Sequence, residues 1–278
     1  MRQGNMSLSD SASALEFRKR NSFLKKEKAE IIMIQKTIEI QINNENNGDF
    51  FPTLHTYILD NSPDIDPNRK RPAVIICPGG GYTRTSDREA EPVAIQMNAM
   101  GFHSFILRYS CSPATFPTPQ LELAKAIAIV RENAQEWNID ENKVMVLGFS
   151  AGGHLAASMG VFWDREFIYE PIGVSPEKIK PSGLILCYPV ITSGEYAHKG
   201  SFKALLGDKY EELLDFVSLE NQVGDQTPPT FIWHTFEDSS VPLENTLLYI
   251  NAMKKHRVPM EVHIYPRGRH GLSLANYE

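Results

Sequence analysis

The sequence predicts an α/β fold in which a mostly parallel central sheet carries helices on both faces. From residue 34 onward, short apolar runs alternate with segments of helical periodicity, which is the pattern of successive β–α–β units. The run PAVIIC at 72–77 is continuously apolar, as expected for a strand that helices cover on both sides. A chain of 278 residues with 42% hydrophobic content can bury one large core of this kind.

The elements are expected in a regular order along the chain. Two opening strands, which could pair antiparallel, precede the parallel ones; strands are predicted over 36–42, 55–60, 72–81, 102–110, 143–149, 182–190, 228–236 and 260–268. Helices are predicted over 88–101, 118–137, 151–163 and 243–258. Thr118 is expected to be the N-cap of the second helix, with Pro119 in its first turn.

Two regions depart from this regular pattern. Residues 1–32 are polar, and their seven basic and four acidic residues give a net charge of +3 through Glu30, so we expect a disordered or weakly ordered leader before one domain over 33–278. The amphipathic segment 201–217 predicts a small cap-like insertion, within 191–226, over the carboxyl edge of the sheet. No apolar run reaches the roughly 20 residues of a membrane span, which favours a soluble, cytoplasmic protein without a membrane partner.

Charge and cysteine content narrow the function classes. The net charge of −6, from 28 basic and 34 acidic residues, does not favour binding to nucleic acid and suits a small, neutral substrate. Three cysteines are too few for a disulfide framework and lack the spacing of a metal site. Cys77 and Cys187 lie in apolar runs and are expected to be buried free thiols. A homodimer is compatible with this composition.

Gly148, Ser150 and Gly152 form a GxSxG motif where an apolar strand passes into a helix. This placement is typical of a nucleophile elbow, in which a strained serine backbone tolerates only small residues two positions away. The alternative is a serine that caps the following helix. Neither this segment nor GGGYTR completes a P-loop or a GxGxxG pattern, so nucleotide binding is not expected.

A serine nucleophile needs a histidine base that a carboxylate orients. His270 follows the last predicted strand in a glycine-flanked loop and is favoured, whereas His154, one turn after Ser150, is expected to pack behind the elbow. Asp238 directly follows a strand and is favoured over Glu237, since Ser, Asp, His is the chain order of this motif class. The remaining histidines are assigned to strand or surface positions: His55, His103, His198, His234, His256 and His263.

The segment CPGGGY ends an earlier strand and supplies candidates for an oxyanion hole. Its glycines let backbone amides approach a bound carbonyl, so we expect Gly80 and Gly81 to donate beside the amide of Ala151. The alternative is a plain glycine-rich turn. Three residues near the same edge of the sheet are candidates for shaping the substrate pocket, and each could equally be structural: Tyr82, Arg88 and Tyr109.

Five segments carry a resemblance to a known family: CPGGGY, SDREAEPVA, GFSAGGHLAAS, WHTFEDSSVP and GRHGLSLAN. Over about residues 36–276 the chain resembles the α/β hydrolase superfamily, and within it a bacterial carbohydrate-esterase-like group described as xylan esterases, sugar hydrolases or lipase/esterases. The resemblance implies Ser150 as nucleophile, His270 as base and acid, and Asp238 as its orienting partner. PGGG stands here where the hormone-sensitive-lipase-like branch has HGGG, so the choice of oxyanion glycine stays open.

The resemblance also implies a function and a missing element. We expect a serine hydrolase that removes short acyl groups, such as acetyl, from xylo-oligosaccharides or similar sugars, without metal or organic cofactor. Alternatives are an amidase or peptidase with the same triad and a catalytically silent ligand-binding relative. Members of this group usually continue into a last helix that packs on the sheet, whereas this sequence stops at Glu278, so we expect either that the helix is missing here or that another segment covers that face.

Overall fold

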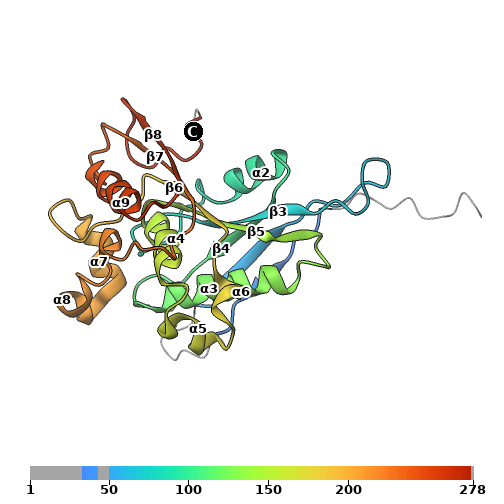
Figure 1. Ribbon diagram of the computed structural model, residues 1–278, viewed down its shortest axis with the longest axis horizontal. Helices are drawn as coiled ribbons and strands as arrows, with labels where there is room; N and C mark the ends of the chain where they lie inside the picture. Colours follow the sequence, from blue (N-terminus) through green and yellow to red (C-terminus); the bar gives the residue numbers. More distant parts are fainter. Residues whose placement is uncertain (1–32, 43–49, 277–278) are drawn as a thin grey trace, which may run out of the picture. The chain divides into compact units, whose positions relative to one another are not determined.

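The computed structural model describes residues 33–42 and 50–276, and its centre is a β-sheet (Figure 1). Within these residues the sheet has eight strands in the order β1-β2-β4-β3-β5-β6-β7-β8. The strands are β1 (Thr37–Glu39), β2 (Thr53–Tyr57), β3 (Arg71–Cys77), β4 (His103–Arg108), β5 (Ile139–Phe149), β6 (Gly183–Cys187), β7 (Thr230–Thr235) and β8 (Met260–Tyr265). β2 pairs antiparallel with β1 and β4, and the other neighbours are parallel, so the predicted mostly parallel sheet is confirmed. The leader predicted over 1–32 lies outside the described residues.

Helices cover both faces of the sheet, as predicted. Successive side chains of a strand point to opposite faces, and in β3 Val74 packs into one apolar cluster while Ile75 packs into another. The first cluster includes α2 (Glu91–Ala99), and the second includes α3 (Thr118–Glu132), α4 (Ser150–Phe162) and α9 (Glu244–Lys255). Figure 1 shows α2 on the opposite side of the sheet from α3 and α4. Cys77 and Cys187 are buried free thiols, which confirms that prediction.

Several predicted boundaries are wrong for local reasons. Pro117, not Thr118, is the N-cap of α3, because the amide of Leu121 already bonds the Pro117 carbonyl. β5 begins at Ile139, earlier than predicted, because Ile139 pairs with Arg71 at the start of β3. This early start also shortens α3 at its carboxyl end. Two helices were not predicted, because each is too short for a helical repeat to stand out: α5 (Glu166–Ile172) and α6 (Pro176–Ile179).

The segment between β6 and β7 forms the predicted insertion as a series of short helices. These are α7 (Lys199–Leu206), η1 (Gly207–Lys209), α8 (Tyr210–Leu213) and η2 (Leu219–Asn221). Phe202, Leu205 and Leu206 turn the apolar face of α7 into the core. The insertion is also tied to α4, since His154 Nε2 donates 2.9 Å to the carbonyl oxygen of Val217.

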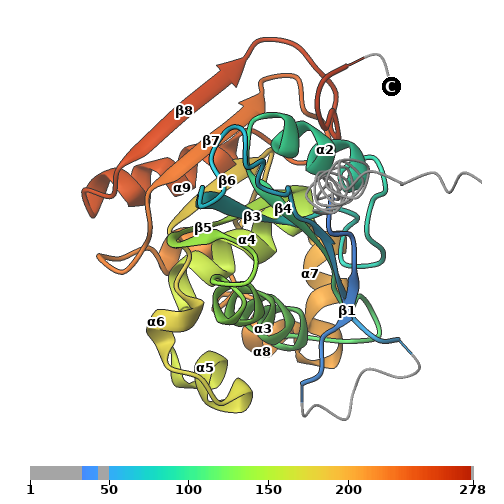
Figure 2. The ribbon, with the colours of Figure 1, turned by 90° about the vertical axis from the view of Figure 1, so that its right-hand side faces the viewer.

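The sheet face on the side of α2 is open at its β7–β8 end. α2 packs against β2, β3 and β4, and Figure 2 shows β7 and β8 at the far edge of the sheet. Phe231, Trp233 and Tyr265 of these two strands line a hollow. The two alternatives that the resemblance implies for this face stay predictions. Among the helices of the same residues, none is both long and apolar enough to cross a bilayer.

Glu122 is a carboxyl group enclosed in the core. Its Oε2 accepts a hydrogen bond of 2.7 Å from the amide of Ser110, while its Oε1 has no partner among the described residues. Burial raises the pKa of Glu122 to about 7, although the Ser110 hydrogen bonds act in the opposite direction. Between pH 4.5 and 7 the native state therefore keeps a proton that the unfolded chain releases.

Because of this difference, the free energy of unfolding falls as the pH rises through that interval. Glu122→Gln removes the titration and keeps an acceptor for Ser110, so we expect it to stabilise the protein by about 3 kcal/mol at pH 8 and by less than about 1 kcal/mol at pH 5. Urea titrations at the two pH values measure both numbers. Glu132→Gln, an exposed change in the same helix, is the control, and an equal effect of the two variants would contradict the prediction.

Candidate active site

Ser150 lies at a sharp turn between β5 and α4. Its φ is +53°, in the left-handed region, directly after the extended residue Phe149. A Cβ on Gly148 would collide with the carbonyl oxygen of Gly152, and a Cβ on Gly152 would collide with that of Cys77. The prediction of a strained serine between obligatory small residues is therefore confirmed.

The turn points Ser150 at His270. The Ser150 Oγ donates to His270 Nε2 at 2.8 Å, and His270 Nδ1 donates to Asp238 Oδ2 at 2.6 Å. The three residues follow β5, β8 and β7, whose carboxyl ends meet at one edge of the parallel sheet. We refer to this arrangement as the Ser150–His270–Asp238 chain. The structure thus brings His270 together with Asp238, which is 32 positions away in the sequence, and with Ser150, which is 120 positions away.

Asp238 is held ionised by the donors around it. Its side chain is fully buried, and Oδ1 accepts 2.9 Å hydrogen bonds from the amides of Ser240 and Val241. Burial favours the neutral acid, but hydrogen bonds from His234, His270 and the Val241 amide outweigh it and hold the pKa of Asp238 well below its usual range. The rival Glu237 is exposed and lies near the amide of Gly268 instead.

His234 supports Asp238 from behind, a role that the sequence did not reveal. Its Nε2 lies 3.0 Å from the carbonyl oxygen of Val241 and 3.3 Å from Asp238 Oδ2, and its Nδ1 lies 2.8 Å from Thr246 Oγ1. The alternating pattern of β7 places His234 on an inner face but does not say what it meets there. The sequence signal that could have indicated this role was the presence of a polar residue, His234, at a buried position of a strand.

Two of the three residues proposed from the sequence to shape the pocket do not reach it. Tyr82 is buried and its hydroxyl donates 2.9 Å to Nδ1 of His154, while the hydroxyl of Tyr109 donates 2.6 Å to the carbonyl oxygen of Pro78. Both tyrosines hold the loop after β3 in place, which is the structural role that the sequence analysis left open for them. His154 packs behind the elbow as expected, and burial lowers its pKa to about 4.

A pocket of about 460 Å³ opens over Ser150 and His270. One wall is the loop after β3, including Gly80, Gly81 and Arg88, so Arg88 lies where the sequence predicted it. The start of the insertion also borders the pocket, through His198 and Gly200. The sequence assigned His198 to a strand or surface position; it lies in no strand, is half-buried and borders this pocket as the N-cap of α7 (Lys199–Leu206).

The loop after β3 leaves two glycine amides free beside the serine. The amide of Gly79 donates 2.8 Å to Glu89 Oε2, whereas the amides of Gly80 and Gly81 donate to no group within the described residues. Both glycines have positive φ, of 137° and 67°. The amide of Ala151 lies in the first turn of α4, where no intrahelical acceptor exists. The amides of Gly80, Gly81 and Ala151 therefore have no acceptor among the described residues and are free to donate to a bound group.

Glu89 links this loop to the histidine, and sequence reasoning missed it. Besides accepting from the Gly79 amide, it accepts 2.7 Å from the hydroxyl of Tyr188 through Oε1. The Tyr188 ring contacts the ring of His270 edge-on, with centroids 5.0 Å apart, and its hydroxyl accepts from the amide of Ser273. Glu89 is thus a buried carboxylate with both oxygens bonded, and it fixes two walls of the pocket together.

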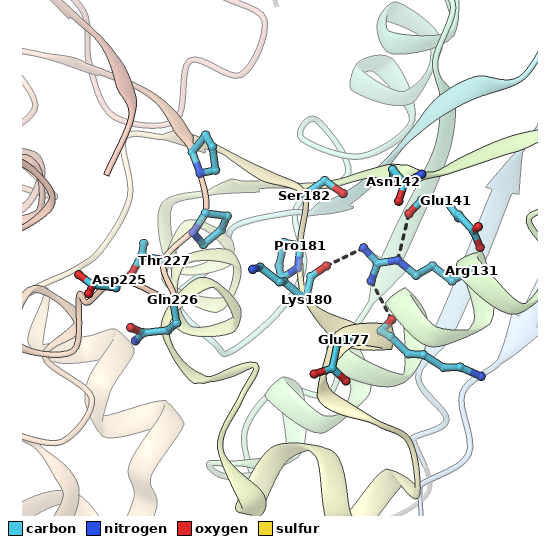
Figure 3. Close-up of a pocket in the computed structure, with 13 residues that line it drawn as sticks. Arg131, Glu141, Asn142, Glu177, Lys180, Pro181, Ser182, Asp225, Gln226 and Thr227 are labelled. Atoms are coloured by element: carbon cyan, nitrogen blue, oxygen red, sulfur yellow. Dashed lines mark hydrogen bonds between the residues drawn. The ribbon is translucent and has the colours of Figure 1, made fainter. Parts of the chain in front are cut away.

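A second hollow, of about 580 Å³, lies at the opposite, amino-terminal end of β6 and β7 (Figure 3). Arg131 donates through Nε, Nη1 and Nη2 to the carbonyl oxygens of Glu141, Lys178 and Lys180. Arg131 therefore ties α3, β5 and α6 together rather than offering charge to a ligand. Among the described residues, no group of His, Cys, Asp and Glu side chains is arranged to hold a metal ion.

The arrangement over Ser150 suits attack on a carbonyl carbon. The imidazole of His270 can accept the hydroxyl proton, the ionised Asp238 can stabilise the imidazolium that forms, and the free amides can bind a developing oxyanion. His270 and the two glycines border the same pocket as Ser150.

Comparison with known proteins gives a consistent set of relatives. Residues 62–253 match the model of the family described as BD-FAE. The endo-1,4-beta-xylanase B of Butyrivibrio fibrisolvens is 38% identical over 247 residues, which cover 86% of this chain and 38% of that protein. The acetylxylan esterase of Xylanibacter ruminicola is 32% identical over 212 residues, or 74% of this chain and 42% of the esterase. The chain spans about two fifths of the length of these curated relatives.

A solved structure matches the chain over most of its length. The acetyl ester-xyloside bifunctional hydrolase from Caldicellulosiruptor lactoaceticus superimposes with a TM-score of 0.77 and 42% identity, covering 89% of this chain and 91% of that one. With further carboxylesterases and an α/β hydrolase among the structural neighbours, the α/β hydrolase fold predicted from the sequence is confirmed.

Proposed function

Because the chain belongs to the BD-FAE family of α/β hydrolases, we propose that it is a serine esterase that cleaves carboxylic esters of carbohydrates through an acyl-enzyme. The observation that carries this proposal is the Ser150–His270–Asp238 chain, with its hydrogen bonds of 2.8 and 2.6 Å. Supporting it are the ionised state of Asp238 and the open pocket over Ser150.

In the proposed mechanism, His270 Nε2 takes the hydroxyl proton of Ser150 as Oγ attacks the ester carbonyl carbon. The tetrahedral intermediate collapses when the bond to the alcohol oxygen breaks, and His270 gives its proton to that oxygen. Water then enters, His270 takes one of its protons, and the attack on the acyl-enzyme releases the acid and restores Ser150. Asp238 accepts from Nδ1 throughout and stabilises the imidazolium in both steps.

The oxyanion of both tetrahedral intermediates is assigned to the amides of Ala151 and of Gly80 or Gly81. The Gly79 amide is already bonded to Glu89, which favours its two neighbours as donors. Because these donors are fixed before the substrate binds, they stabilise the oxyanion without reorganisation. Glu89 acts here as a positioning residue, since it holds the loop that presents them.

The carbohydrate half of the proposal is supported by the names of the relatives and by the polarity of the pocket. Two relatives that match most of this chain are named acetylxylan esterase and acetyl ester-xyloside bifunctional hydrolase. Polar groups border the pocket and can bind sugar hydroxyl groups, among them Thr83, Arg84, Ser86 and Arg88. We propose short acyl groups, such as acetyl, on xylo-oligosaccharides as the substrate.

The first test of this function is the substitution Ser150→Ala. We expect kcat/KM for acetylated xylo-oligosaccharides to fall by about 10³-fold or more, because the group that forms the acyl-enzyme is lost. Ser158→Ala is the matched control, since Ser158 lies in the same helix and bonds the carbonyl oxygen of Leu155. Hydrolysis that persists in the Ser150 variant would refute the proposal, and faster cleavage of the matching acetamides than of the esters by the wild type would favour an amidase.

The second test concerns Glu89. In Glu89→Gln the side-chain NH₂ faces one of the two donors, Gly79 N–H or Tyr188 O–H, so one hydrogen bond is lost. We expect kcat to fall about tenfold or more with KM changed less than about threefold, because the amide donors act mainly on the transition state. Glu91→Gln, an exposed change nearby, should leave both constants unchanged. A Glu89 variant with wild-type kcat would contradict the positioning role.

A further inference from the structure

His198 lines the pocket that opens over the reacting serine. It lies at the start of the insertion as the N-cap of α7, and it borders the same 460 Å³ pocket as Ser150 and His270. It is half-buried, and it is the N-cap residue whose side chain accepts from the Ser201 amide. Nothing in the mechanism above uses this side chain.

The contacts of His198 decide which of its nitrogens carries the proton. Its Nδ1 lies 3.3 Å from the backbone amide of Ser201 and 2.8 Å from the Ser201 hydroxyl. A backbone amide can only donate, so Nδ1 must be the acceptor. Burial and the charge of His270 lower the pKa of His198, which keeps the ring neutral near pH 7. The proton of the neutral ring is therefore on Nε2.

The Nε2–H group has no acceptor within the described part of the chain. Nε2 makes no hydrogen bond there. It is also not one of the solvent-inaccessible polar atoms that lack a partner, so it must be exposed to solvent. An accessible donor that is fixed by the cap hydrogen bond, on the wall of a reactive pocket, can bind an acceptor on a substrate.

The side of the pocket identifies the part of the substrate that His198 meets. His270 must deliver its proton to the oxygen of the leaving alcohol, so the alcohol half of the ester lies on the His270 side. Since His198 and His270 border the same pocket of about 460 Å³, the free donor of His198 can reach that half. A sugar presents hydroxyl and ring oxygens there, whereas a simple phenol presents none.

We infer that His198 is a specificity-determining residue of the esterase site, whose Nε2–H donates a hydrogen bond to an oxygen of a polyhydroxylated alcohol half. This inference rests on the proposed function. It assigns to the insertion a part in choosing the alcohol, in addition to covering the sheet edge.

Two substitutions separate the roles of the two ring nitrogens. In His198→Asn, Oδ1 replaces Nδ1 as the acceptor that caps α7, while the donor at the position of Nε2 is lost. In His198→Gln, the side-chain amide reaches the position of Nε2 and restores a donor, while the cap is lost. Wild type and both variants are assayed with acetylated xylobiose and with phenyl acetate, which share the acyl group and differ in the alcohol.

We expect His198→Asn to lower kcat/KM for acetylated xylobiose about tenfold, which corresponds to one lost hydrogen bond, and to leave phenyl acetate within about twofold. In His198→Gln the ratio of the two kcat/KM values should stay within about threefold of that of the wild type. This variant should melt at a lower temperature than the wild type, because a helix cap is lost. The inference would be overturned if the ratio of kcat/KM for acetylated xylobiose to kcat/KM for phenyl acetate were unchanged in His198→Asn. It would also be overturned if this ratio fell equally in both variants.

The same assay separates this inference from the proposed function. If wild type hydrolyses neither ester, the esterase proposal itself fails. If wild type hydrolyses both and His198→Asn slows both to the same extent, the esterase proposal stands and the role of His198 in specificity is refuted. A wild-type melting temperature for His198→Asn would show that the capped helix is intact.

Discussion

The left-handed backbone of Ser150 is the constraint on which the rest of the site depends. A residue other than glycine pays about 1–2 kcal/mol for this conformation, and the close packing of Gly148, Gly152 and the Cys77 carbonyl maintains it. Because the chain turns so sharply, the hydroxyl stands at the end of β5, within 2.8 Å of His270. The same turn leaves the amide of Ala151 unbonded at the start of α4. One local strain thus positions both a nucleophile and a donor.

Buried polar contacts carry this arrangement from one loop to the next. Glu89 bonds the loop after β3 to Tyr188, and Tyr188 in turn contacts His270 and accepts from Ser273 in the last loop. His234 supports Asp238 from within β7. Each loop alone would be free to shift, because loops have few apolar contacts. The hydrogen bonds that the loops share fix their positions relative to one another and to the core.

The sequence predicted the residues whose role follows from place along the chain. Ser150, Asp238 and His270 each follow an apolar run, and parallel strands bring such ends together, so order and pattern were sufficient to nominate them. Tyr82 and Tyr109 occupy similar places, but their hydroxyls turn back toward buried partners, and a sequence pattern does not give the direction of a side chain. Contacts such as those of Glu89 and His198 depend on how distant loops fold over one another, which no local pattern encodes. The cytoplasmic location and the homodimer stay predictions.

The central claim, that the fold activates Ser150 as a nucleophile, can be tested by labelling the protein with a fluorophosphonate and mapping the adduct by mass spectrometry. Such a reagent reacts with a serine whose proton a neighbouring base accepts. The account predicts one equivalent of label on Ser150 in the folded protein and none after unfolding in urea. An unlabelled Ser150 in the folded protein, or equal labelling of other serines, would contradict it.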